Sequence, residues 1–130
     1  MSEMNWEAGS WTCKTMKSMN PKLVGQSSTF TATAHPKYIL ATSSDDVSRI
    51  VYNAHLKKFV YIDTSDDGTY VTATSPGYIN GKSTWTPILA DDGDLSYVVM
   101  ITLQGTSKYI FDVAKSATSK PFSESICTKS

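Results

Sequence analysis

Two cysteines lie near opposite ends of this 130-residue chain, Cys13 in the first strand-like segment and Cys127 in the last. Between them, short segments of alternating apolar and polar residues follow one another almost without interruption. In a closed antiparallel barrel the first and last strands are neighbours, so a disulfide between these cysteines would close the barrel. Structural disulfides persist in oxidising compartments, so the pair also indicates a location. The alternative is two unrelated buried thiols.

The composition is that of one globular domain, residues 1–130. A chain of this length buries roughly two thirds of its extended surface, enough for a single core. Hydrophobic residues make up 40% and charged residues 18%, which excludes a disordered chain. Twelve basic residues balance twelve acidic ones, so no electrostatic signature of nucleic-acid binding is present. The apolar runs are too short for a membrane span. We therefore expect no nucleic-acid partner and no membrane span.

Period-two alternation recurs along the chain, and serine and threonine, which favour turns and strands, number 34. Glycine, proline and aspartate separate the segments, as in the turn at 66–68. The only helices expected are a turn at the N-terminus and another near 115–119. The expected strands are 9–17, 26–34, 37–44, 47–54, 57–64, 69–75, 82–89, 95–103, 107–114 and 122–129.

Strands joined mainly by short turns form a meander, which must pack as a sandwich or curl closed to protect its edges. Closure is favoured because it also brings Cys13 beside Cys127. The predicted fold is all-β, a closed antiparallel up-and-down barrel of about 8–10 strands. Alternation separates the two faces of each strand but does not show which face points inward.

Several segments carry a resemblance to a known group of proteins. The opening Trp6-Glu-Ala-Gly-Ser-Trp-Thr-Cys resembles the first strand of calycin-type barrels, the lipocalin and fatty-acid-binding superfamily. The WxC start, the segments 51–63 and 73–86 and the C-terminal Cys-Thr-Lys are similar to bacterial lipocalin-like proteins of unknown function. The resemblance covers nearly the whole chain. It implies that Trp11 packs across the closed end of the barrel. It also implies an internal cavity for a small, mostly apolar ligand, and no shared reaction.

The first residues, Met1–Trp6, lack the basic start and apolar stretch of a signal peptide. Either the protein is cytoplasmic or a leader has been removed. The cysteine pair favours the second, a secreted or periplasmic protein that is a monomer or a homodimer.

Aromatic residues on different strands can converge in a ligand pocket, where rings supply apolar contact and hydroxyls supply orientation. The alternatives are rings that fill the barrel, or an outer patch that binds protein. The candidate ligand-binding residues are Tyr38, Tyr52, Tyr61, Tyr70, Trp85, Tyr97 and Phe111.

Asp63 and Tyr61 are the weak catalytic candidates, because a carboxylate in an apolar interior has a raised pKa and can act as an acid or base. The alternative for Asp63 is an ordinary solvated strand end. Only His35 and His55 are histidines, which is too few for a zinc site, and neither lies late in the chain where haem-binding barrels place a ligand. The segment 91–94 fits a hairpin turn better than a calcium loop. We expect no metal and no cofactor.

Three functions fit these features. The first is binding of a small hydrophobic or aromatic molecule inside the barrel. The second is a cyclase or isomerase that orients its substrate in the same cavity. The third is a secreted module that binds protein through its loops.

Overall fold

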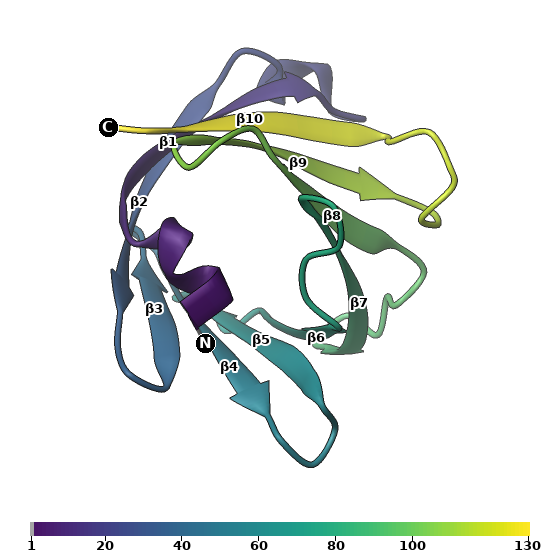
Figure 1. The fold of residues 1–130 in the computed structure, drawn as a ribbon. Coiled ribbons are helices and arrows are strands. Elements are labelled where there is room, and N and C mark those ends of the chain that lie inside the picture. Colours follow the sequence, from purple (N-terminus) through teal and green to yellow (C-terminus); the bar gives the residue numbers. More distant parts are fainter. Residues whose placement is uncertain (1) are drawn as a thin grey trace.

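A computed structural model describes residues 2–130 as a closed ring of ten antiparallel strands, each hydrogen-bonded to its neighbours in sequence, with the last strand paired to the first (Figure 1). The predicted closed antiparallel barrel is confirmed. The strands are β1 (Gly9–Lys17), β2 (Ser27–Ala34), β3 (Tyr38–Thr42), β4 (Asp46–Asn53), β5 (Lys58–Ser65), β6 (Tyr70–Ser75), β7 (Lys82–Ala90), β8 (Val98–Leu103), β9 (Lys108–Ala114) and β10 (Ser123–Lys129).

The strand boundaries match the expected ranges closely, with the largest difference at β8, which begins at Val98 and not at 95. Asp94 explains the difference, because its carboxylate accepts hydrogen bonds from the amide and hydroxyl of Ser96. Such local side-chain bonds compete with the strand ladder. Residues 115–119 form a turn and not the helix that was expected.

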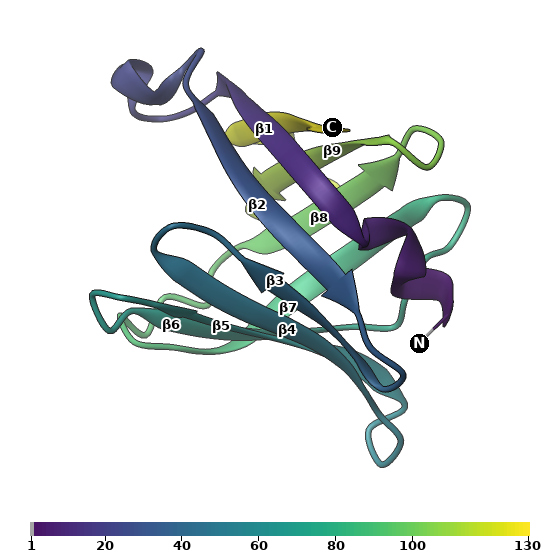
Figure 2. The ribbon, with the colours of Figure 1, turned by 90° about the vertical axis from the view of Figure 1, so that its left-hand side faces the viewer.

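Two short 3₁₀ helices complete the fold. The first, η1 (Ser2–Glu7), is the expected N-terminal turn and packs against β2 and β3 across one end of the barrel (Figures 1 and 2). The second, η2 (Pro21–Leu23), was not expected; its first turn is capped by Asn20, whose side chain accepts a hydrogen bond from the Lys22 amide. We call the end covered by η1 the closed end and the opposite end the open end.

Strand alternation divides the wall into an inner and an outer face, and the hydrophobic clusters show which is inner. Ile39 of β3 lies opposite Ile50 of β4, and Tyr61 of β5 lies opposite Ala73 of β6, all within one cluster with Met4 of η1. A second cluster joins Trp11, Tyr109 and Cys127 on β1, β9 and β10. The core is therefore the barrel interior, and it is densest at the closed end.

Cys13 and Cys127 form a disulfide across the junction between β1 and β10. The predicted bond is therefore present, and it joins the two strands that close the ring. A structural disulfide of this kind is compatible with an oxidising compartment. In residues 2–130, no helix is long and apolar enough to cross a membrane.

Candidate functional site

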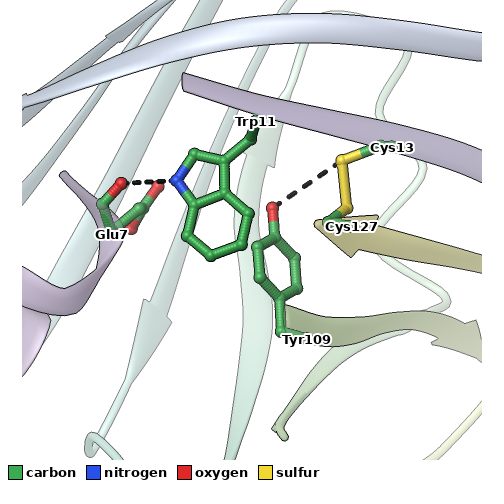
Figure 3. The surroundings of a disulfide bond; sticks show 5 residues. All are labelled: Glu7, Trp11, Cys13, Tyr109 and Cys127. Atoms are coloured by element: carbon green, nitrogen blue, oxygen red, sulfur yellow. Dashed lines mark hydrogen bonds between the residues drawn. A yellow bond between two sulfur atoms is a disulfide. The ribbon is translucent and has the colours of Figure 1, made fainter. Parts of the chain in front are cut away.

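The closed end of the barrel is an aromatic floor. Trp11 is 1% exposed, and Trp6 packs edge-on against it with ring centroids 5.7 Å apart. Tyr109 lies 5.0 Å from Trp11, and the Trp11 indole Nε1 donates a 2.7 Å hydrogen bond to the carbonyl oxygen of Glu7 (Figure 3). This is the position across the closed end that the resemblance implied for Trp11. The floor fixes the end of η1 relative to β1 and β9.

Glu7, the last residue of η1, directs its carboxylate into this enclosed end. Burial raises the pKa of Glu7 to about 7. Burial also raises the pKa of Tyr78 and of Tyr109, and in both cases the nearby charge of Glu7 raises it further. These tyrosines lie in the β6–β7 connection and on β9, so they approach Glu7 from separate parts of the wall. The Glu7 carboxylate therefore lies among tyrosines inside the barrel.

Sequence reasoning missed Glu7. The available signal was its place, directly before the first strand and beside Trp6, in the segment expected to form an N-terminal turn.

Tyr61 and Asp63 both occupy inward positions on β5, two residues apart. Burial raises the pKa of Asp63 to about 7, and the neighbouring carboxyl of Asp46 on β4 contributes in the same direction. Burial, Asp63, Asp46 and Glu7 all raise the pKa of Tyr61, while an interaction with the Ser48 hydroxyl lowers it. Tyr61 therefore lies between the carboxylate at the closed end and the carboxylates toward the open end.

Two polar atoms of this interior are buried without a hydrogen-bond partner, Trp6 Nε1 at the closed end and Asp63 Oδ1 nearer the open end. A third such atom, Asp112 Oδ1, belongs to the outer face of β9. More than 90% of buried polar groups in proteins have a partner. The two inner atoms therefore mark places where a polar group of another molecule would be favoured.

The aromatic candidates divide between the two faces of the wall. Tyr61, Trp85 and Phe111 point inward, with the Tyr61 and Trp85 rings 6.2 Å apart. Tyr52 is on the inner face of β4 but at the rim of the closed end, where it is 46% exposed and packs edge-on against Phe59. Three of the seven candidates therefore face the barrel interior, and of these Tyr61 and Trp85 are in contact.

Tyr38 lies on the outer face, because its neighbour Ile39 occupies the inward position on β3. Its ring stacks on His35 at 4.4 Å and lies 5.1 Å under the Arg49 guanidinium. Tyr38 therefore does not converge with Tyr61. The period-two pattern allowed either face, and packing of Ile39 in the core decided between them.

Tyr70 and Tyr97 lie at the open end, in the rim of a pocket of about 210 Å³. Tyr70 starts β6, and Tyr97 directly precedes β8. Asp63 contributes to the same pocket, so the inner carboxylate and the two outer rings share one space. The residues that line this rim pocket are Asp63, Thr69, Tyr70, Val71, Ala90, Asp91, Asp92 and Tyr97.

The inner wall is accessible from the open end. Inward residues of the closed half, such as Ile39, Phe59 and Tyr109, are buried. Inward residues of the open half keep part of their accessible surface and mix hydroxyls with apolar groups. Solvent therefore reaches the interior from this end. The partly exposed inward residues are Thr15, Asp46, Ser48, Asp63, Val71, Val99, Phe111, Val113, Ser123 and Ser125.

The same end is strongly acidic on one side. Three connections at this end, β3–β4, β5–β6 and β7–β8, contain no lysine or arginine. The other two connections of this end, β1–β2 and β9–β10, carry Lys22, Lys115 and Lys120, so the negative charge is confined to one side. The aspartates in these connections and the adjoining strand ends are Asp45, Asp46, Asp63, Asp66, Asp67, Asp91, Asp92 and Asp94.

Some of these aspartates already accept hydrogen bonds from backbone amides near the hairpin connections. Asp91 accepts a hydrogen bond from the Tyr70 amide, and Asp92 accepts one from the Asp94 amide. His35 stacks on Tyr38, and His55 is exposed in the β4–β5 turn. Within residues 2–130, no group of three His, Cys, Asp or Glu side chains is arranged to hold a metal ion.

No family model matches the chain. Comparison with curated proteins also finds no match. The geometry of the barrel interior is therefore the basis for assigning a function.

Proposed function

We propose that this protein binds a small molecule with an aromatic or hydrophobic body inside its barrel, as lipocalin-like proteins do. The observation that carries the proposal is the contrast along the inner wall. The closed half is sealed by aromatic rings, while the open half presents accessible hydroxyl and apolar side chains. Pockets for small ligands combine mainly apolar walls with a few polar groups in this way.

The inner aromatic residues supply the apolar contact. Tyr61 and Trp85 meet edge-on, and Phe111 faces inward from β9, two strands further round the ring from β7. Rings in such positions contribute large contact areas at low entropic cost. The disulfide at the β1–β10 junction keeps the wall closed, which suits a protein that works in a secreted or periplasmic location.

A pair of substitutions on β4 tests the proposal. Ser48→Trp places a large ring on the accessible inner wall, and Val47→Trp places the same ring on the outer face one residue away, where Val47 is 46% exposed. The probes are 1-naphthalenemethanol, which is neutral, and its amine analogue 1-naphthylmethylamine, with binding followed by isothermal titration calorimetry. We expect Ser48→Trp to weaken binding about tenfold or more, equal to about 1.4 kcal/mol, and Val47→Trp to leave it within about twofold.

Binding of neither probe to the wild-type barrel, or equal loss in both variants, would contradict the proposal. Circular dichroism of both variants establishes that each remains folded, so that weaker binding is attributable to the blocked wall.

A second function, acid–base catalysis in the same interior, is favoured by the pKa values of Glu7 and Asp63, both raised to about 7 by burial. A general acid or base works best when its pKa is near the working pH. Turnover of a bound compound that is lost in Glu7→Gln or Asp63→Asn while binding persists would support an isomerase over a binding protein.

A further inference from the structure

We infer that the molecule bound by this barrel is an organic amine in its protonated form, whose ammonium group is held at the open end by Asp63 and the tyrosines of the rim pocket. This inference rests on the proposed function and adds the charge of the ligand and the position of its head group.

The first support is the charge of the inner wall. The ionisable side chains that face the interior along the strands are the carboxylates of Asp46 and Asp63, with Glu7 at the closed end. One basic residue, Lys129, occupies an inward position, at the extreme closed end of β10. Its ammonium is already held there, donating a 2.7 Å hydrogen bond to the Trp6 carbonyl and lying 5.0 Å from the Trp11 ring. Within residues 2–130, no lysine or arginine is among the groups that act on Asp63.

The second support is the pairing of Asp46 with Asp63. Two carboxyl groups that share a site cannot both ionise cheaply, so one of them holds a proton unless a cation replaces it. With both carboxyls ionised, Asp63 Oδ1 is buried without a hydrogen-bond donor, so it is then an acceptor with unused capacity. An ammonium group offers a positive charge, which allows both carboxyls to ionise, and up to three hydrogen-bond donors, one of which can pair with Asp63 Oδ1.

The third support is the rim pocket itself. Tyr70 and Tyr97 line, together with Asp63, a space of about 210 Å³. Organic cations are recognised by aromatic faces combined with a carboxylate. The aspartate-rich connections on the Asp63 side of this opening add a negative potential there, which attracts cations and repels anions. A neutral ligand would gain neither the charge pairing with Asp63 nor the negative potential of these connections.

The position of the head group leaves the body of the ligand in the apolar interior. Tyr61 lies next to Asp63 along the inner face of β5, and Trp85 and Val99 follow across β7 and β8. A flat hydrocarbon body attached to an ammonium at Asp63 would therefore lie toward Tyr61 and Val99, which keep part of their surface accessible. An aryl-alkyl amine fits this arrangement.

Three naphthalene compounds of matched shape test the charge preference: 1-naphthylmethylamine, 1-naphthalenemethanol and 1-naphthoate. By calorimetry near pH 8 we expect the wild-type protein to bind the amine at least about tenfold more tightly than the alcohol, and the carboxylate most weakly. Equal affinity for amine and alcohol would overturn the inference while leaving the proposed binding function in place. Binding of none of the three would overturn both.

Asp63→Asn tests the location, with Asp66→Asn as the matched control. Both remove one negative charge from the β5–β6 region, but only Asp63 lines the pocket. We expect Asp63→Asn to abolish the preference for the amine over the alcohol, and Asp66→Asn to change it by less than about twofold, the size of a general electrostatic effect. A preference that survives in Asp63→Asn but disappears in Glu7→Gln would place the ammonium at the closed end and overturn the assignment.

The release of a proton on amine binding can be measured on the wild-type protein, so this test does not depend on a variant being folded. The groups that surround Asp63 on β4, β5 and the β3–β4 connection are Asp46, Asp45, Tyr61 and Ser48. Across the rim pocket, Asp63 faces Asp91, Asp92 and Tyr97. Near pH 6.5 the site holds a proton that the ammonium displaces. The heat of amine binding to the wild-type protein should therefore depend on the ionisation enthalpy of the buffer, and that of the alcohol should not. The same heat in every buffer would contradict the inference.

Discussion

Cys13 and Cys127 lie directly opposite each other in the ladder between β1 and β10 and are joined by a disulfide that spans 114 residues of sequence. Every other neighbouring pair of strands in the ring is consecutive in the chain. Within this ring, the β1–β10 ladder is therefore the junction whose two strands are not joined directly by a connecting segment, and it is the one that carries the covalent bond.

Removing the disulfide should lower stability substantially. In the chain-entropy treatment, closing a loop of this length contributes on the order of 4–5 kcal/mol, less any strain. We expect Cys13→Ala combined with Cys127→Ala to lower the free energy of unfolding, measured by urea titration, by several kcal/mol. Reduction of the wild-type protein serves as the control and should give a similar loss. A change below about 1 kcal/mol would show that the ladder closes the barrel without help.

Gly77 should tolerate no side chain. Its φ is +109°, and a Cβ there would lie 3.0 Å from a carboxylate oxygen of Glu3 and 3.1 Å from the Phe59 ring. We expect Gly77→Ala to cost about 2–4 kcal/mol from backbone strain and overpacking together. Gly68→Ala is the matched control, because Gly68 also has a positive φ, +91°, but has open space around it. Similar losses in urea unfolding for both variants would show that strain alone acts at Gly77.

Glu7 should make the protein less stable as the pH rises. Its pKa is raised by burial from 4.5 to about 7, so between these values the native state binds more protons than the unfolded state. The stability present below pH 4.5 is lost progressively as the pH rises through about 7, up to about 3 kcal/mol in total.

Glu7→Gln removes this dependence. We expect the variant to equal the wild type near pH 4 and to be more stable near pH 8, as measured by urea unfolding across the range. Glu3→Gln, on the same short helix but exposed, should leave the wild-type profile unchanged. Some dependence will remain in Glu7→Gln, because burial also raises the pKa of Asp63 to about 7 and of Asp112 to about 6. Parallel profiles for wild type and Glu7→Gln would contradict the enclosed position of this carboxylate.

Substitution of an aromatic residue should weaken ligand binding when the residue lies on the inner face of the wall and not when it lies on the outer face. Phe111→Ala removes a ring from the inner wall and should weaken binding of 1-naphthylmethylamine by about 1 kcal/mol or more. Tyr38→Ala removes a ring from the outer face and should leave affinity within about twofold. Calorimetry on both variants distinguishes them. Equal losses would mean that the ligand does not lie inside the barrel.

Much of the fold could be predicted because short-range chemistry specifies it. The turn at Asp66–Gly68 and the alternation on either side of it gave strands close to β5 and β6, and the remaining hairpins followed in the same way. The start of β8 could not be placed, because the hydrogen bonds of Asp94 to Ser96 are invisible in a pattern of apolar and polar residues.

The candidate site was predicted less completely. Asp63 and Tyr61 were selected because they share one face of a strand, and that relation holds in any structure that contains the strand. Tyr38 was selected because aromatic residues on different strands can converge, and it faces outward, since its neighbour Ile39 packs in the core. The carboxylate of Glu7 belongs to no strand, so no periodicity could place it.

The sequence by itself determined the ten strands, their meander order and the expectation that Cys13 would meet Cys127, because turns and alternation are local and a closed meander has only one junction between its ends. Only the tertiary structure decided which face of each strand points inward, since either face of an alternating strand can be buried. It also decided that Glu7, Tyr61 and Asp63 share one interior, because that depends on how η1 folds across the end of the closed ring.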